Sequence, residues 1–332
     1  MLKLALIGLG RWGKHIQRTL KGINGVEVVA YDRNPPQPSF DPTSPQGYAG
    51  RGRGDIAGAL IATPGSTHAE IALPFIRQGL PVFIEKPMAT SLKHAQRLAV
   101  AAKKSGSQLF TGHIHLYNPA YLKLKALLPR IGTVQAIHFE GLAPGPVRED
   151  MSVLWDWGPH GVSLMLDLLG KLPKEVQGWG PAYAPASAQG FGGRSKASAG
   201  ETRTFGHTAM AKLLFAREVT TTMHVSWVSP EKRVKLTVIG AKGALILDDT
   251  QPSHEASAGK LVAGKLVFYA GEKVSYPRYS AALPLTEELK AFIRMIKTGE
   301  EPKTGAQSGL DVVRVLEAID RSIQLDGKKV AC

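Results

Sequence analysis

The 332-residue sequence has a single cysteine, Cys332, and no apolar run near the ~20 residues that cross a bilayer. One cysteine excludes both a disulfide framework and a thiolate metal cluster. The first residues lack the regions of a signal peptide, and no run of five or six basic residues or nucleic-acid motif occurs. We therefore expect a cytoplasmic globular protein of about two domains, without metal, membrane or nucleic-acid partners.

The sequence is rich in positively charged residues, since 41 Lys and Arg against 27 Asp and Glu give a formal net charge of +14. Such a field attracts anions, for example a dinucleotide or a phosphorylated or carboxylated substrate. A basic proteome background would give the same balance. The charge alone therefore does not choose between these interpretations.

A glycine-rich turn follows the first apolar run. Gly8, Gly10 and Gly13 have the spacing Gly-x-Gly-x-x-Gly, with Arg11 and Trp12 before the third glycine. The first glycine permits a tight turn, the second lets the backbone approach a pyrophosphate, and the third lets the next helix pack against the strand. The free N–H groups at the helix start favour phosphate. We predict that these five residues bind a dinucleotide.

A carboxylate ends the next largely apolar run, where Asp32 follows residues 26–31. A carboxylate at this point accepts hydrogen bonds from the ribose 2′-OH and favours NAD over NADP. Arg33 comes directly after it, and Arg51 and Arg53 are near in sequence. We predict NAD as the cofactor, with Asp32 and Arg33 among its contacts, and leave NADP open.

Residues 1–117 alternate strand-like and helix-like segments. The short apolar runs are residues 4–7, 26–31, 59–62, 82–84 and 109–110. Their length suits buried parallel strands, so we predict an α/β fold with an N-terminal Rossmann domain, a doubly wound parallel sheet. The proline- and glycine-rich residues 34–54 are expected to form a loop.

Residues 118–332 have a different pattern, with several strand-like runs and no helices between them. These runs are residues 134–139, 209–215, 219–227, 234–239 and 244–247. They predict a C-terminal α+β domain on a mainly antiparallel open sheet. A long loop is expected at residues 178–206, and helices at the end of the chain.

Two polar clusters could carry chemistry. Glu85-Lys86-Pro87 follows the fourth strand-like run, and ligands bind at the carboxyl ends of parallel strands. There Lys86 could stabilise a developing alkoxide, or it could be a solvated surface charge.

The second cluster contains Asp156, Pro159 and His160. Pro159 suits the first turn of a helix, which Asp156 could cap. Alternatively, Asp156 orients His160, which then takes a proton from a hydroxyl. A capping carboxylate beside a structural histidine is the plainer interpretation.

The order of these motifs resembles that of the Gfo/Idh/MocA oxidoreductases over essentially the whole chain. The matching motifs are Gly8-x-Gly10-x-x-Gly13, Ala62-Thr63-Pro64 with His68, Glu85-Lys86-Pro87, and Asp156-x-Gly158-x-His160. The resemblance implies hydride transfer between NAD or NADP and a secondary alcohol of a sugar, polyol or nucleotide sugar. It also implies a homodimer or homotetramer formed through the C-terminal sheet.

By resemblance, Lys86, Asp156 and His160 match the family's catalytic trio. His160 would be the acid/base, Asp156 would orient it, and Lys86 would polarise the reacting oxygen. The same resemblance makes further residues cofactor contacts. These are Thr63, Pro64, His68, Glu85 and Lys86.

Four features depart from the family pattern. Residues 34–54 form a shortened, proline-rich segment, and Leu116 stands where many members carry Arg. Gly206-His207-Thr208 stands where an acidic pair is frequent, and Gly161 follows His160 where Asp is common. None of them belongs to the trio, so the resemblance still implies the same chemistry but does not identify the substrate. Two rival functions implied by relatives are a redox-neutral NAD-dependent glycosidase and a sugar-sensing regulator, and the intact trio argues against the second.

Overall fold

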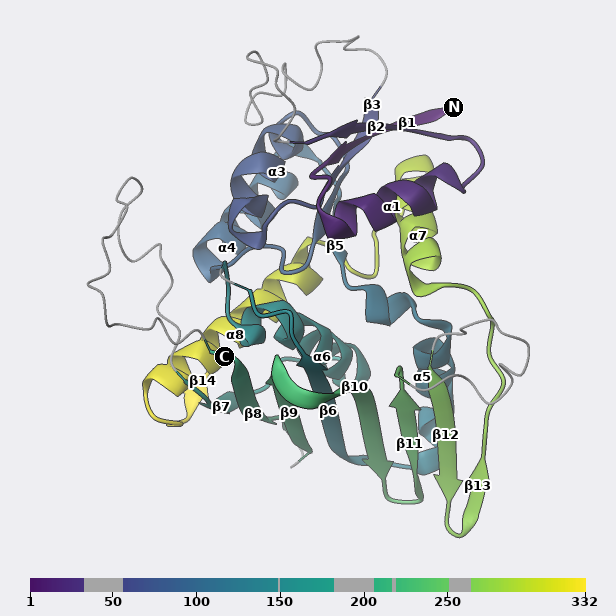
Figure 1. The fold of residues 1–332 in the computed structure, drawn as a ribbon, viewed down its shortest axis with the longest axis vertical. Coiled ribbons are helices and arrows are strands. Elements are labelled where there is room, and N and C mark those ends of the chain that lie inside the picture. The colour runs from purple at the N-terminus through teal and green to yellow at the C-terminus, as the bar shows by residue number, and fades with distance from the viewer. Residues whose placement is uncertain (33–55, 149, 182–205, 217–218, 251–263) are drawn as a thin grey trace. The chain divides into compact units, whose positions relative to one another are not determined.

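The computed structural model describes residues 1–32, 56–148, 150–181, 206–216, 219–250 and 264–332 (Figure 1). Arg33 and the loop predicted at residues 34–54 lie outside these ranges, as do residues 182–205 of the second predicted loop. That loop was expected from residue 178, but residues 178 and 179 belong to a strand. In the described ranges, no helix has the length and apolar character needed to span a bilayer.

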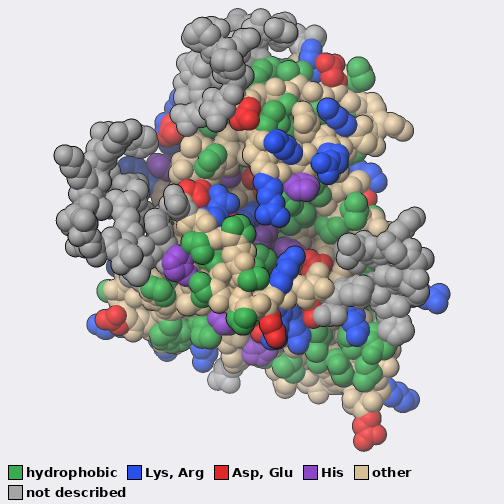
Figure 2. Space-filling view, viewed as in Figure 1, with side chains coloured by type: hydrophobic (Ala, Val, Ile, Leu, Met, Phe, Trp, Pro, Cys, Tyr) green, Lys and Arg blue, Asp and Glu red, His purple; other side chains and the backbone are tan. Residues whose placement is uncertain are grey.

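Two compact units divide the described chain. The first contains residues 1–126 and 277–314, and the second contains residues 127–250, 264–276 and 315–332, with the gaps given above. Charged side chains of both signs lie among hydrophobic ones on the face shown in Figure 2.

The first unit is built on the predicted parallel sheet. Its strands are β1 (Leu2–Ile7), β2 (Val26–Tyr31), β3 (Ile56–Ile61), β4 (Val82–Glu85) and β5 (Leu109–Gly112). They pair in the order β2-β1-β3-β4-β5, so that the chain crosses to the other side of β1 after β2. In open α/β sheets this change of direction marks the ligand crevice, at the carboxyl ends of the strands.

Helices connect and cover these strands. They are α1 (Arg11–Lys21), α3 (His68–Arg77), α4 (Leu92–Ser105) and α7 (Pro284–Thr298), with 3₁₀ turns η1 (Gly65–Thr67) and η2 (Ile114–Tyr117). Helix α4 begins where the Ser91 hydroxyl accepts a hydrogen bond from the His94 N–H, and ends at Gly106 with φ +72°. Both are ordinary helix-end signals.

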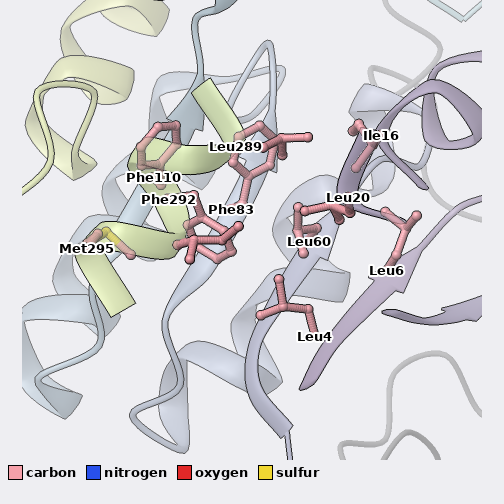
Figure 3. Close-up of a cluster of buried hydrophobic side chains, with 11 residues drawn as sticks. Leu4, Leu6, Ile16, Leu20, Leu60, Phe83, Phe110, Leu289, Phe292 and Met295 are labelled. Atoms are coloured by element: carbon pink, nitrogen blue, oxygen red, sulfur yellow. The ribbon is translucent and has the colours of Figure 1, made fainter. Parts of the chain in front are cut away.

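The core of the first unit joins segments far apart in sequence. Phe83 of β4 stacks on Phe110 of β5 at 5.2 Å, and Phe292 of α7 meets both rings edge-on at 5.7 Å (Figure 3). Burial of each such ring contributes about 1.5–3 kcal/mol. Helix α7 therefore belongs to the Rossmann sheet, although it lies in the last fifth of the chain.

The second unit contains a mainly antiparallel sheet, as predicted. Its strands are β6 (Val134–Pro144), β7 (Glu175–Trp179), β8 (Thr208–Leu214), β9 (Thr220–Ser226), β10 (Val228–Gly240), β11 (Gly243–Asp248), β12 (Lys265–Ala270), β13 (Lys273–Ser275) and β14 (Val330–Ala331). They pair in the order β13-β12-β11-β10-β6-β9-β8-β7-β14, and β6 and β9 pair in parallel.

Three helices complete the described structure. They are α5 (Pro119–Ile131), α6 (Val153–Leu169) and α8 (Ala306–Gln324). The division between the two units falls within α5 and α8. Helix α6 lies against β6 and β9 of the second sheet and carries the predicted residues Asp156 and His160.

Candidate active site

The predicted glycine turn lies at the carboxyl end of β1. Gly8 has φ +97°, a conformation that L residues with a side chain rarely adopt. A Cβ on Gly13 would lie 1.9 Å from the Gly8 carbonyl oxygen, so the start of α1 can approach the turn only without a side chain there. A Cβ on Gly10, by contrast, would meet nothing within 4 Å. The turn is therefore packed against the rest of the protein at Gly13, whereas at Gly10 there is free space beside the backbone.

The first turn of α1 fits a phosphate group. Gly10 occupies the N-cap position and supplies no side-chain cap, and no acidic residue lies in the first turn. The leading N–H groups of a helix have no partner within the helix, and its dipole favours an anion there. Arg11 and Trp12 are the first two helical residues. This arrangement is suited to a dinucleotide pyrophosphate.

Asp32 adjoins this turn. The Gly8 N–H donates to the carbonyl of Tyr31 at 2.9 Å, which fixes the end of β2 beside the glycine turn. Asp32 follows Tyr31 directly and is half-buried. The position agrees with a ribose contact, whereas Arg33 cannot be placed because it lies outside the described residues.

His68 connects two loops at the carboxyl edge of the sheet. Its Nδ1 lies 2.8 Å from the carbonyl oxygen of Pro87, and its Nε2 lies 2.8 Å from that of Thr63. The side chain is 1% exposed. It thus holds the segment after β3 to the segment after β4, next to Lys86. Direct contact with a dinucleotide stays a prediction for His68 and also for Thr63.

Glu85 ties the end of β4 to the glycine turn. The indole Nε1 of Trp12 donates to its Oε1 at 2.5 Å, and the backbone N–H of Lys86 donates to its Oε2 at 3.2 Å. Burial raises the pKa of Glu85 to about 7, although the Trp12 hydrogen bond and the Lys86 charge lower it. A Cβ on Gly112 would come within 3.2 Å of this carboxyl, so the neighbouring strand leaves room for it.

His113 is a site residue that the sequence prediction did not include. It follows β5 directly, is 1% exposed, and lies close enough to Lys86 for the lysine charge to lower its pKa. Burial, followed by the Lys86 charge, lowers the pKa of His113 to about 3. The imidazole is therefore neutral at physiological pH, and Lys86 supplies the positive charge at this edge of the sheet.

These titrations predict how stability depends on pH. A buried carboxyl with a raised pKa binds more protons in the folded chain, so stability is lost as pH rises through the folded pKa. The lowered pKa of His113 has the opposite effect, because it makes stability rise with pH. That effect is confined to pH values below 6.5, the ordinary pKa of histidine. We therefore expect the free energy of unfolding to fall between pH 6.5 and about 8, by at most about 1.4 kcal/mol per pH unit for each proton. Urea unfolding followed by circular dichroism measures this, and a level or rising stability would contradict it.

Helix α6 of the second unit begins earlier than predicted. Ser152 is the N-cap and Val153 the first helical residue, so Pro159 lies in the interior and not in the first turn. The N–H groups of Trp155 and Asp156 both donate to the Ser152 carbonyl at 3.1 Å, which starts the helix before the proline. Asp156 is thus within the first turn and does not cap the helix.

Asp156 and His160 are four residues apart on α6 and therefore share a face. The ring of Trp157 meets the His160 ring edge-on at 5.9 Å. A Cβ on Gly161 would lie 2.6 Å from Phe139 of β6, so α6 packs closely against the sheet at this residue. This packing leaves no room for a side chain at residue 161.

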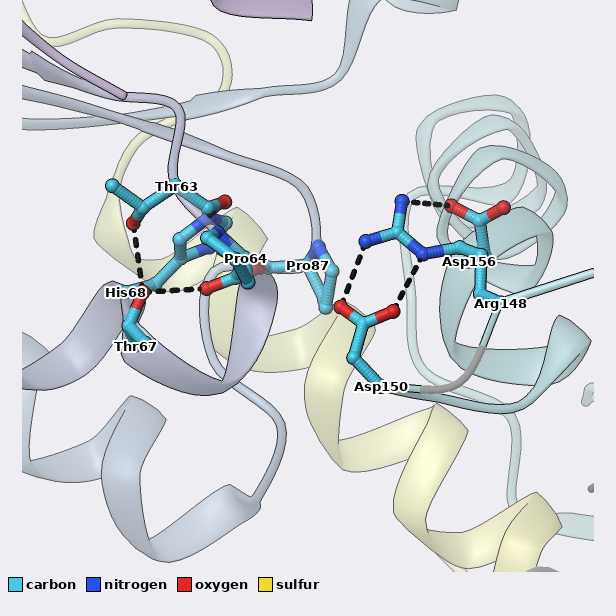
Figure 4. Close-up of polar contacts among 8 residues, drawn as sticks. All are labelled: Thr63, Pro64, Thr67, His68, Pro87, Arg148, Asp150 and Asp156. Carbon is cyan, nitrogen blue, oxygen red and sulfur yellow. Dashed lines mark hydrogen bonds and ion pairs between the residues drawn. The ribbon is translucent and has the colours of Figure 1, made fainter. Parts of the chain in front are cut away.

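Arg148 is a second residue that the sequence prediction missed. Its Nε and Nη2 donate to the two carboxylate oxygens of Asp150, each at 2.8 Å, and its Nη1 lies 3.8 Å from Asp156 Oδ1 (Figure 4). The bidentate pair fixes the guanidinium plane. Arg148 thus places a permanent positive charge beside Asp156.

The predicted residues fall into two groups. The first unit brings together the glycine turn, Trp12, Glu85 and Lys86, and the second unit brings together Asp156 and His160. The described residues contain no group of three His, Cys, Asp or Glu that could hold a metal ion.

Curated relatives match parts of the chain. An inositol 2-dehydrogenase from Ralstonia nicotianae is 32% identical over 146 residues, which are 41% of this chain and 43% of the relative. Inositol 2-dehydrogenase 2 from Saccharopolyspora erythraea is 26% identical over 190 residues, or 51% and 54% of the two chains. The chain thus spans about half the length of these relatives.

Solved structures match nearly all of it. A protein from Magnetospirillum magnetotacticum is 30% identical and aligns over 96% of this chain and 99% of its own, with a TM-score of 0.76. An inositol dehydrogenase homolog from Azotobacter vinelandii, complexed with NADH and myo-inositol, shares the fold at 16% identity. Its TM-score is 0.77, over 100% of this chain and 97% of its own.

Two family models match part of each unit. Residues 49–113 match an oxidoreductase family with an NAD-binding Rossmann fold, and residues 121–246 match the GFO/IDH/MocA C-terminal domain. The glycine turn with its uncapped helix belongs to the same first unit as residues 49–113. The chain therefore belongs to the Gfo/Idh/MocA family of oxidoreductases, and its first unit is an NAD-binding Rossmann domain.

Proposed function

We propose that this protein is a dehydrogenase that transfers a hydride between NAD and a secondary alcohol of a sugar or polyol. The observation that carries the proposal is the position of Lys86, at the carboxyl end of β4, in a chain of this family. Its charge acts on both Glu85 and His113. The inositol 2-dehydrogenases among the relatives support a cyclic polyol as a substrate class.

Three side chains are assigned roles in this proposal. His160 removes the proton of the reacting hydroxyl, Asp156 holds the imidazole in the required tautomer, and Lys86 stabilises negative charge on the oxygen. NAD held by the glycine turn of residues 8–13 would supply the acceptor for the hydride of the alcohol carbon. Arg148, which lies 3.8 Å from Asp156 Oδ1, gives that carboxylate a cationic neighbour in this scheme.

A substrate panel tests the proposal. Purified protein is mixed with NAD or NADP and with sugars, polyols, sugar acids and nucleotide sugars, and reduced nicotinamide is followed by its near-ultraviolet absorbance. Reduction that depends on one class of alcohol supports a dehydrogenase and names the class. Cleavage of a glycoside without net reduction would replace it with the redox-neutral glycosidase.

Replacing Asp32 by alanine is expected to weaken NAD binding more than NADP binding. The carboxylate accepts hydrogen bonds from the ribose 2′-OH of NAD but repels the 2′-phosphate of NADP. A hydrogen bond to a charged group is worth about 1.5–3 kcal/mol, so NAD affinity should fall at least tenfold. Calorimetric titration with each cofactor measures the change, with Glu27→Ala, on the strand that precedes Asp32, as the control. An equal loss for both cofactors would remove Asp32 from ribose recognition.

We also propose that the second unit forms a homodimer or homotetramer through its sheet. Large apolar side chains on its strands are exposed, including Met210 (51%), Val228 (59%) and Ile239 (37%). Exposed apolar groups on a sheet face favour association. Light scattering coupled to gel filtration tests this, and a monomer at micromolar concentration would contradict it.

A further inference from the structure

Glu288 of α7 is a fully buried acidic residue that the proposed mechanism does not use. Its exposure is 0%, and among the described residues no donor reaches either of its carboxyl oxygens. An ionised carboxylate in such surroundings is unfavourable because nothing replaces the water that it has lost. The neighbouring Glu287, by contrast, forms an exposed ion pair with Lys290 at 3.0 Å.

The packing of α7 places Glu288 beside Glu85. Phe292 lies one helical turn after Glu288 on the same face, and its ring is 5.7 Å from that of Phe83 (Figure 3). Phe83 and Glu85 are two residues apart on β4 and therefore point to the same side of the sheet. If Phe292 lies at the level of Phe83, then Glu288, one turn earlier on α7, lies at the level of Glu85, two residues later on β4.

A second contact fixes the direction of the helix. Ile296, a further turn along α7, lies over the first half of β3, where its Cδ1 would be 2.9 Å from a Cβ on Gly58. Helix α7 therefore runs opposite to the strands. Its first turns, which carry Glu288, lie over the carboxyl end of the sheet, where Glu85 stands.

The two carboxyls differ in their hydrogen-bond donors. Glu85 accepts from the Trp12 indole at 2.5 Å and from the Lys86 N–H at 3.2 Å. Donors to a carboxylate stabilise its ionised form. Glu288 has no donor among the described residues. When two close carboxyls share one proton, that proton therefore belongs on Glu288.

We propose that Glu288 keeps its proton at neutral pH and donates it in a hydrogen bond to Glu85, which favours the ionised form of Glu85 and so holds Trp12 in the dinucleotide turn. Glu288 is then a positioning residue for the cofactor site, and acts through Glu85 and Trp12. Burial, and next the charge of Glu85, raise the pKa of Glu288 well above its ordinary value, in agreement with this assignment.

The other titratable groups near the pair are consistent with it. Lys86 acts on Glu85 from the end of β4. Tyr117 of η2 faces Glu288, and burial raises its pKa, so that it is neutral. Arg294 of α7 is near enough to Tyr117 to act on it. Among these groups only Glu85 offers a charged acceptor for the Glu288 proton.

The first test compares two substitutions of Glu288 by calorimetric titration of the protein with NADH. Glu288→Leu removes the donor, and NADH affinity is expected to fall about tenfold because the bond to a charged acceptor is lost. Glu288→Gln retains an N–H donor and is expected to keep most of that affinity. Glu287→Leu is the matched control on the neighbouring, partly exposed position and should bind NADH as the parent protein does.

A second arm separates positioning from general damage. In a Trp12→Phe background the indole donor is absent, so Glu288→Leu should cause little further loss of NADH affinity. If Glu288→Leu and Glu288→Gln bind NADH equally well, or if the loss persists fully without the Trp12 indole, the proposed path is wrong.

A measurement without cofactor tests the proton itself. The infrared carbonyl stretch of a protonated carboxylic acid is expected at pH 7 in the parent protein and in Glu287→Gln. It should be much reduced in Glu288→Gln, where the carboxyl of Glu85, whose pKa is about 7, still contributes to it. A parent spectrum without this band, or a band that Glu288→Gln leaves unchanged, would show that Glu288 does not hold the proton. This result stands even if the leucine variant fails to fold, and it does not depend on the substrate proposed above.

Discussion

Replacing His160 by alanine is expected to lower turnover by about 10²–10⁴-fold, the usual contribution of a positioned acid/base group. The structure gives this side chain the surroundings of such a group. Asp156 is one helical turn before it, Trp157 contacts its ring edge, and Arg148 keeps a positive charge beside Asp156. Because His160 belongs to the second unit, NAD binding to the first unit should persist.

Steady-state kinetics with the substrate identified by the panel measure the loss, and titration with NADH checks the binding. His94→Ala, on α4 of the first unit, is the control and should leave turnover near that of the parent protein. If His160→Ala keeps its turnover, His160 is not the acid/base and the assignment of the trio fails.

Replacing Lys86 by methionine is the second large change. We expect turnover to fall about 10²–10³-fold, as it does when one group that stabilises a developing oxyanion is removed. The fold should survive, because Lys86 is half-buried at the end of a strand and methionine has a similar apolar stem. Removing its charge should also raise the pKa of His113, which that charge now lowers.

The kinetic split identifies the role of Lys86. Loss in kcat with little change in KM indicates a contact made in the transition state, whereas a rise in KM alone indicates substrate binding. Lys93→Met on the exposed side of α4 is the control. A Lys86→Met protein with unchanged kcat would rule out the electrostatic role, whatever happened to KM.

The sequence predicted the first unit well because its signals are local. The strand predicted at residues 26–31 coincides with β2, and the glycine spacing predicted the turn in which Gly8 adopts φ +97°. A glycine that must accept a positive φ and another that must pack against backbone are constraints within one short segment. Such constraints can be identified without knowledge of the rest of the fold.

The start of α6 was predicted wrongly because proline was taken as the first-turn signal. The helix instead begins at Val153, whose neighbours Leu154 and Trp155 are also buried. Burial of these three side chains outweighs the preference of Pro159 for a first turn. The local pattern did not contain that tertiary contribution.

Glu288 could not be distinguished from its neighbour in the sequence. Glu287 and Glu288 both look like polar positions of an amphipathic helix, but one is partly exposed and the other is fully buried. The difference arises because α7 packs on β4, a strand about 200 residues earlier in the chain. Contacts between residues so far apart in the sequence produce no local periodicity from which burial could be predicted.

The central claim, direct hydride transfer, is tested most directly with a substrate deuterated at its reacting carbon. The alcohol identified by the panel is supplied in this form with unlabelled NAD, and the cofactor is analysed by mass spectrometry. We expect reduced cofactor that carries one deuterium from the substrate. Unlabelled cofactor together with a product that has kept or regained its deuterium would contradict net oxidation and favour the redox-neutral reaction.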